Sequence, residues 1–254
     1  MDVKRSRYVE YTPVAGPSAR HVACTWVGAT GDDGGYTDRV LPDACIDVIW
    51  DGTSIFVAGP DTGPVPVLPS PGQRFAGLRF GPGKAPAFLG VPASDLLDSR
   101  VSLGDLWGET AAASLVGRLA AAPSPEHAAD LLDEAIADRA GTAPESDPIV
   151  DHLVAVFRKQ PDAGGVVQLA SRVLSVGERR LHRHCLAAVG YGPKMLERVL
   201  RFQRARRLAP DTGSLATVAA LAGYADQAHL TRESRRLAGL TPSDLFKTAP
   251  LAAS

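Results

Sequence analysis

The sequence predicts an α+β protein with two parts. The first is an N-terminal antiparallel β-barrel or sandwich-like domain with appended helices, and the second is a C-terminal all-α domain with two helix–turn–helix motifs. Short runs of β-forming residues fill the first 80 positions, and apolar residues at helical spacing follow them. Residues 165–254 carry 14 Lys and Arg against 6 Asp and Glu, although the whole chain has a net charge of −1. A basic part joined to an acidic part predicts a polyanion-binding module attached to a domain of another kind.

The β-rich part is predicted from β-forming runs that are separated by clusters of Gly, Pro and Asp. Asp51-Gly52 is a hairpin turn signal, because Gly accepts positive φ. We expect residues 1–108 to form a sensing or dimerisation domain. The runs expected to form strands are Arg7–Tyr11, His21–Val27, Arg39–Leu41, Cys45–Trp50, Ser54–Ala58 and Arg74–Phe80.

Helical patterns follow Gly81-Pro82-Gly83. Residues 109–162 are expected to form a helical linker region, and Pro161–Gly165 breaks the pattern and marks a domain boundary. Ser94 is expected to cap one of the short helices. The helical segments are Ala85–Leu89, Ser94–Leu97, residues 110–122, Pro125–Ala140 and Pro148–Phe157.

The first helix–turn–helix pattern consists of an apolar segment, Val167–Leu174, a break at Ser175–Gly177, and a second helix from Glu178 to Cys185. Leu181 is the inward-pointing residue of the second helix. Such a helix, with polar side chains exposed at its N-terminal end, is typical of a motif that enters the DNA major groove. The outward residues that we expect to contact bases are Arg179, His182 and Arg183.

The second pattern repeats this order about fifty residues later. Leu215–Ala222, capped by Ser214, is followed by a break and by a helix that starts after the capping residue Asp226. Leu230 points inward in this helix. The residues that we expect to contact bases are Gln227, Ala228, His229, Thr231 and Arg232.

A helix predicted over Lys194–Ala209 separates the two patterns by roughly 24 Å. Its polar face is rich in arginine, and a basic residue beside a recognition helix is typical of a phosphate contact. The residues that we expect to contact phosphates are Arg198, Arg201, Arg204 and Arg235. Solvated charge on ordinary helix hairpins is the alternative interpretation, but two copies on a basic background favour DNA.

Residues 165–246 resemble the DNA-binding domain of AraC/XylS-type transcription regulators. The resemblance rests on Gly190-Tyr191-Gly192-Pro193, the run from Arg198 to Ala205, and the segment from Gly223-Tyr224 to Pro242. It implies a seven-helix domain with two recognition helices in successive major grooves, and it places the base contacts at the residues named above. The chain departs from the family at Cys185 and Ser234, where Phe is usual.

Residues 20–108 are similar to an N-terminal domain of uncharacterised role that occurs on some of these regulators. The matching segments are Leu41–Trp50, Val57–Pro60, Gly77–Gly83 and Leu89–Ala93. The resemblance implies sensing or dimerisation and no particular ligand. Trp26, Trp50 and Phe80 are candidates for an apolar ligand pocket, with ordinary core packing as the alternative.

Cysteine content and the N-terminus bear on compartment and chemistry. Three cysteines without paired spacing predict a reducing compartment. The sequence shows neither a secretory signal pattern nor an apolar stretch long enough to span a membrane, so we expect a cytoplasmic protein that does not associate with a membrane. His21, Cys24 and Cys45 lack zinc-finger spacing, so we expect no metal and no cofactor. A DNA-targeted enzyme that uses Cys24 or Cys45 as nucleophile is the alternative function, but the sequence offers neither cysteine a catalytic partner.

The sequence therefore predicts a transcription regulator that is not an enzyme. Its basic part reads double-stranded DNA, and its acidic part senses a small-molecule effector or mediates self-association. Dimerisation without sensing is a further alternative for the acidic part. A homodimer partner and RNA polymerase are the other partners to consider.

Overall fold

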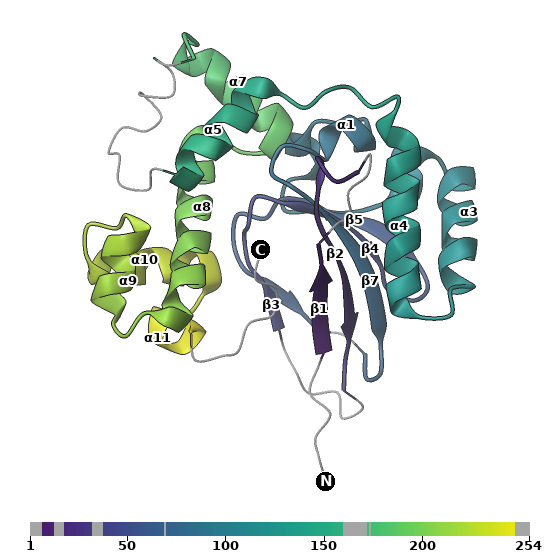
Figure 1. Ribbon diagram of the computed structural model, residues 1–254, viewed down its shortest axis with the longest axis horizontal. Coiled ribbons are helices and arrows are strands. Elements are labelled where there is room, and N and C mark those ends of the chain that lie inside the picture. Colours follow the sequence, from purple (N-terminus) through teal and green to yellow (C-terminus); the bar gives the residue numbers. More distant parts are fainter. Residues whose placement is uncertain are drawn as a thin grey trace.

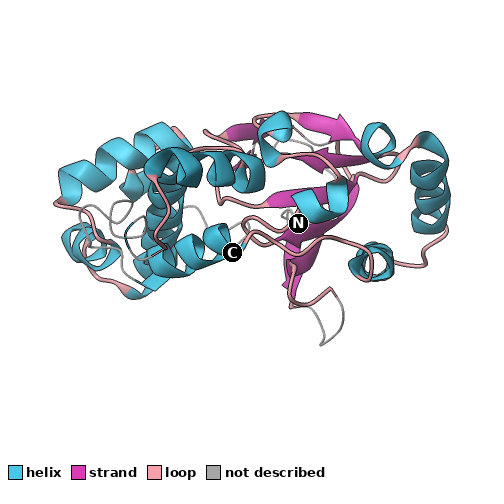
Figure 2. Cartoon of the chain, turned by 90° about the horizontal axis from the view of Figure 1, so that it is seen from above, coloured by secondary structure: helices cyan, strands magenta, loops and turns pink. Residues whose placement is uncertain are grey.

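The computed structural model describes residues 7–12, 18–31, 38–68, 70–159, 172 and 174–246. An N-terminal unit (β1 to α4) is built on antiparallel strands, and a helical unit (α5 to α11) lies beside it, as Figures 1 and 2 show from two directions. The predicted fold class is confirmed. The strands are β1 (Arg7–Tyr11), β2 (Val22–Ala29), β3 (Asp38–Val40), β4 (Ile46–Trp50), β5 (Ile55–Ala58), β6 (Val65–Val67), β7 (Arg74–Phe80) and β8 (Arg100–Ser102).

Six strands form one sheet in the order β1-β2-β7-β4-β5-β8, and β3 pairs with β6 in a second sheet. Every pair is antiparallel. The predicted turn at Asp51-Gly52 joins β4 to β5: Asp51 accepts hydrogen bonds from the backbone N–H groups of Thr53 and Ser54, and Gly52 has φ of 98°. Two strands, β6 and β8, were not predicted. Each is only three residues long, and in β6 Pro66 interrupts the β-forming run.

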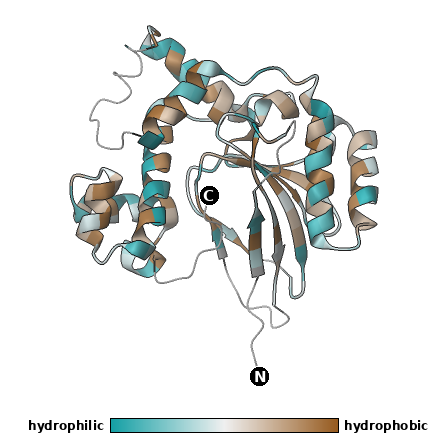
Figure 3. Cartoon of the chain, viewed as in Figure 1, coloured by the Kyte–Doolittle hydropathy of each residue, from teal (hydrophilic) through white to brown (hydrophobic). Residues whose placement is uncertain are grey.

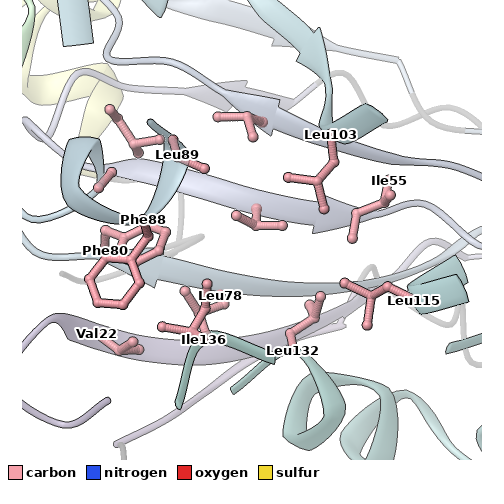
Figure 4. Packing of buried hydrophobic residues seen from close by; sticks show 14 of the residues in the cluster. Val22, Ile55, Leu78, Phe80, Phe88, Leu89, Leu103, Leu115, Leu132 and Ile136 are labelled. Carbon is pink, nitrogen blue, oxygen red and sulfur yellow. The ribbon is translucent and has the colours of Figure 1, made fainter. Parts of the chain in front are cut away.

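Helices cover one face of the six-stranded sheet. The main helix, α4, lies across β2 and β7. Leu78 and Phe80 of β7 point into the same core as Leu132 and Ile136 of α4, as Figure 4 shows, and all four side chains are buried. The helices of this unit are α1 (Pro86–Leu89), the 3-10 helix η1 (Ala93–Leu96), α2 (Leu103–Trp107), α3 (Glu109–Ala120) and α4 (Pro125–Ala140).

The opposite face of the sheet carries a buried polar cluster around Arg79. This side chain pairs with Asp47 (Nε to Oδ1, 3.1 Å), with Glu10 (Nη1 to Oε1, 3.3 Å) and with Asp43 (Nε to Oδ2, 3.5 Å). The Trp26 indole donates to Asp47 (3.4 Å). The same indole lies over Gly77, where an added Cβ would come within 2.1 Å of the ring, so this position requires glycine.

The three aromatic residues predicted to line one pocket do not lie together. Strand register places Trp26 opposite Gly77, whereas Phe80 belongs to the helix-covered core and Trp50 packs against that core. Phe80 contacts Phe88 with ring centroids 5.3 Å apart. The pocket prediction for Trp26, Trp50 and Phe80 is therefore wrong as a set, because alternate residues of a strand point to opposite faces.

The helical unit begins after the loop that follows α4. Of the region predicted as a linker, α3 and α4 pack with the sheet, whereas α5 packs against α7 and α8. The predicted break at Pro161–Gly165 and the first helix of the first motif, Val167–Leu174, lie outside the described residues except for Arg172 and Leu174. The helices are α5 (Pro148–Lys159), α7 (Glu178–Val189), α8 (Pro193–Leu208), the 3-10 helix η2 (Ala209–Asp211), α9 (Leu215–Ala222), α10 (Gln227–Ala238) and α11 (Pro242–Leu245).

Side-chain caps mark the start of several helices in both units. Ser214 accepts from the N–H of Thr217 and Asp226 accepts from the N–H of His229, so both predicted caps are confirmed. Ser94 is not a cap: it lies inside η1, which Pro92 precedes. In Figure 3, hydrophilic and hydrophobic colours alternate along α8, as expected for a helix with one face in a core.

The two units share an apolar cluster. Ala44 of the N-terminal unit is buried among side chains of α5, α7 and α8, and Leu41 and Leu97 pack against the same cluster. The buried Gln203 of α8 donates from Nε2 to the carbonyl of Pro42 at 2.6 Å. The helical unit is therefore joined to the N-terminal unit by packing and by a direct hydrogen bond.

Candidate nucleic-acid interface

The second helix of the first motif, α7, buries one side and exposes the other. Leu181 and Cys185 are fully buried, and Arg179, His182 and Arg183 are exposed, as predicted from the helical spacing. The N-cap, Gly177, makes no side-chain capping bond, so the first-turn N–H groups are left without a side-chain acceptor at that position. The exposed end of α7 thus presents basic side chains and helix N–H groups, which both suit an anion.

The matching helix of the second motif, α10, repeats this arrangement. Leu230 is fully buried, whereas Gln227, Ala228 and Arg232 are exposed. The other two predicted base contacts are partly buried: the His229 ring packs edge-on against Tyr224 with centroids 5.1 Å apart, and the Thr231 hydroxyl donates to the carbonyl of Gln227 at 2.9 Å. Tyr224 therefore fixes the orientation of one side chain in the first turn of α10.

The spacing of α7 and α10 comes from α8, which has 16 residues and extends roughly 24 Å. Figure 1 shows α7 at one end of α8 and α9 and α10 at the other. Side chains exposed on this part of the molecule are strongly basic. They include Arg179, Arg180, Arg183, Lys194, Arg232, Arg235 and Arg236.

Three of the four predicted phosphate contacts are engaged inside the helical unit. Arg198 makes a bidentate ion pair with Glu233 of α10, from Nε to Oε2 at 2.7 Å and from Nη2 to Oε1 at 2.9 Å. Arg201 pairs with Glu197, and Arg204 donates to the carbonyls of Leu221 and Arg158. Arg198 and Arg204 therefore link α8 to other helices, whereas the Arg201 pair lies within α8. Arg235 is the exposed member of the predicted set.

A polar chain on α7 was missed by the sequence reasoning. Asp147, just before α5, lies 2.5 Å from Nδ1 of His184, and Nε2 of His184 lies 3.3 Å from Nε of Arg180. The spacing of Arg180 and His184 by four residues was a signal that they share a helix face. Nothing in the sequence identified Asp147 as the partner, because it lies 37 positions away.

The cysteines do not have the properties of nucleophiles. All three are buried and free, and burial raises the pKa of both Cys24 and Cys185 to about 12. Burial also raises the pKa of Cys45 well above its usual value. The enzyme alternative required a lowered pKa at Cys24 or Cys45, and the physical effect of burial is the opposite.

Two further properties concern the described part of the chain. Among these residues, no group of three or more His, Cys, Asp or Glu side chains is arranged to hold a metal ion. Across the same residues, no helix combines the length and apolar character that crossing a membrane requires.

The two departures from the expected Phe pattern are both accommodated in the core. Cys185 and Ser234 are fully buried. The Ser234 hydroxyl donates to the carbonyl of Leu240 at 2.8 Å, so the smaller residue at this position ties α10 to the turn that follows it. Cys185 packs in the apolar cluster shared by the two units.

Comparison with known proteins agrees with both resemblances. Residues 170–248 match the family described as a helix-turn-helix domain, and residues 13–102 match the domain of unknown function DUF6597. No curated protein sequence matches the chain. Similar solved structures are apo ToxT from Vibrio cholerae, with 10% identity over 96% of this chain and 97% of that chain (TM-score 0.47), and ToxT bound to an unsaturated fatty acid, with 10% identity over 98% and 96% (TM-score 0.47).

Proposed function

We propose that this DNA-binding transcription regulator, which joins an AraC-type helix-turn-helix domain to a DUF6597 domain, reads a two-part DNA site with α7 and α10 and is controlled through its N-terminal unit. One observation carries the proposal. Each of the two helices is anchored by a fully buried leucine, Leu181 or Leu230, and turns its polar N-terminal side chains to the surface. A helix exposed in this way fits the major groove.

The chemistry of the exposed side chains supports base reading. Arg183 and Arg232 can each donate two hydrogen bonds to one guanine, and Gln227 suits adenine. We assign base contacts to the eight predicted residues, of which His229 is held in place by Tyr224. The eight are Arg179, His182, Arg183, Gln227, Ala228, His229, Thr231 and Arg232.

Phosphate contact is assigned to Arg235, which is exposed on α10. For Arg198, Arg201 and Arg204 we propose a different role from the one expected. Arg198 joins α8 to Glu233 of α10, and Arg204 joins α8 to the carbonyl of Leu221 in α9. Arg201 pairs with Glu197 one turn away within α8. These contacts support DNA binding by setting the geometry of the two reading helices.

Control is assigned to the N-terminal unit, by a small-molecule effector or by self-association. Its direct contact with α7 and α8 supports this assignment. Through these packed side chains, a conformational change in the N-terminal unit can alter the position of the reading helices. We further propose that the protein is cytoplasmic, that it forms a homodimer and that it contacts RNA polymerase. The cysteine-dependent enzyme is the weaker alternative, because its thiols are buried and held protonated.

The test is selection of binding sites from a random pool of double-stranded DNA with the purified full-length protein. We expect a motif with two half-sites about one helical turn apart. Arg183→Ala and Arg232→Ala should each relax base preference at one position, at a cost of about 1–3 kcal/mol. Arg118→Ala on α3 is the control and should change nothing. Recovery of no motif, or unchanged preference in both variants, would overturn the proposal.

A further inference from the structure

Asp147, His184 and Arg180 form a hydrogen-bonded chain that ends on the exposed side of the first reading helix. The chain begins in the segment between α4 and α5 and crosses to α7. His184 and Asp147 are partly buried, with side chains 27% and 23% exposed, whereas Arg180 is exposed. A partly buried residue outside the motif thus reaches, through His184, a basic side chain on the motif's surface.

The proton positions in this chain follow from what each group can do. A guanidinium only donates hydrogen bonds, so the ring nitrogen that Arg180 meets, Nε2 of His184, has to accept. The ring proton is then on Nδ1, which faces the acceptor oxygen Oδ2 of Asp147. The carboxylate fixes the tautomer and the ring, and the ring in turn holds Nε of Arg180.

Asp147 is itself held firmly. Its second carboxylate oxygen, Oδ1, accepts from the N–H of Ile149 at 2.9 Å, which makes Asp147 the N-terminal cap of α5. The neighbouring Ser146 and Asp151 both bind Nζ of Lys84 from the N-terminal unit, at 2.8 and 2.7 Å. The segment that carries Asp147 is therefore attached to the N-terminal unit.

Arg180 sits beside the base-reading row of α7. Arg180 follows Arg179 by one residue, which places it about 100° further around the helix. When Arg179 and the other outward residues face the bases, Arg180 therefore faces a wall of the groove. Groove walls are lined by phosphates. Within the described residues, no hydrogen bond engages the two terminal nitrogens of Arg180, so they are available to an anion.

We infer that Asp147 and His184 are positioning residues that orient Arg180 to bind a DNA phosphate. The inference rests on the proposed function. It adds a phosphate contact that sequence patterns did not assign, and it makes the segment between α4 and α5 part of the DNA-binding apparatus. The partner is the phosphodiester backbone, so the contact sets affinity and salt dependence and leaves base preference unchanged.

The experiment measures the affinity of the full-length protein for its selected DNA site as a function of salt concentration. Arg180→Ala should lower the steepness of log affinity against log salt by about one. Asp147→Ser keeps a capping hydroxyl for α5 but is too short to reach His184, and it should shift the slope in the same direction. Asp147→Asn can also keep the cap, but it has one acceptor oxygen in place of two, so an NH2 donor then faces Nδ1 of His184. The ring must accept at Nδ1 and carry its proton on Nε2, where it can no longer accept from Arg180, so this variant too should lower the slope.

A double-variant cycle separates positioning from simple structural support. If Asp147 acts through Arg180, the combination of Arg180→Ala with Asp147→Ser should bind DNA no more weakly than Arg180→Ala alone. Additive losses, or a slope that Arg180→Ala leaves unchanged, would overturn the inference while the selected site still binds. Failure of the unmodified protein to select any site would instead count against the proposed function.

Discussion

Replacing Arg79 by methionine should destabilise the protein by about 3–5 kcal/mol at neutral pH, because it removes the cation from a buried cluster of carboxylates. The Arg79 side chain is 6% exposed and lies within 3.5 Å of oxygens from Asp47, Glu10 and Asp43. After the change, the one hydrogen bond that Asp47 keeps from the described side chains is the long bond from Trp26 at 3.4 Å. A buried carboxylate without a counterion is one of the strongest known causes of destabilisation.

The loss should depend on pH in a defined direction. Burial raises the pKa of Asp47 above its usual value, and Arg79 opposes that effect. Without Arg79 the pKa rises further, so the folded variant binds a proton more tightly than the unfolded chain does. Stability from such a group is present at low pH and is lost as pH rises above 3.8 through the folded pKa. The deficit of Arg79→Met should therefore be smaller near about pH 5 than near about pH 8.

Urea unfolding followed by circular dichroism at several pH values measures this deficit. Arg118→Met is the matched control: Arg118 also pairs with a carboxylate, that of Glu134, but the two side chains are 44% and 61% exposed. We expect a loss of only about 0–1 kcal/mol there. Adding Asp47→Leu to Arg79→Met should restore part of the stability. A deficit below about 1 kcal/mol, or one independent of pH, would refute the reasoning.

Three other predictions concern the contact between the units and the cysteines. Gly190→Ala should destabilise by about 1–3 kcal/mol in the same unfolding assay, because Gly190 has φ of +83° and an added Cβ would lie 2.7 Å from Pro60; Gly117→Ala, with open space at the Cβ, should be neutral or stabilising. Gln203→Leu leaves the buried carbonyl of Pro42 without its donor and should cost about 1–3 kcal/mol, and an unchanged midpoint would contradict the role assigned to this bond. The three buried thiols should react with maleimide far more slowly in the native protein than in urea at about pH 8, and rapid native labelling would contradict their burial.

Local signals explain why the helices were predicted well. Pro125–Ala140 is a helix in the structure with the predicted ends, because Ser124 caps it and Pro125 occupies its first turn. Asp226 likewise marks the start of α10 and Gly239, with φ of 69°, marks its end. Capping and glycine signals act within a few residues, so they can be read without knowing the fold.

Contacts between distant segments explain what the sequence did not reveal. The residues Trp26 and Phe80 were assigned to one pocket because both are aromatic, but the strand pairing that separates them is a property of the whole sheet. The arginines of α8 follow a basic helical pattern, and only the fold brings Glu233 to Arg198. The outward residues of α7 and α10 were predictable because one buried leucine in each helix determines which side faces solvent.

The apolar cluster shared by Ala44 and the helices α5, α7 and α8 has a consequence for dissecting the chain. Cutting between α5 and α7 would uncover apolar surface on both pieces, and the helix-turn-helix fragment would lose the carbonyl that Gln203 needs. Such fragments should aggregate when produced separately and should reassemble when co-expressed. Fragment complementation is therefore the appropriate way to study each half of this regulator.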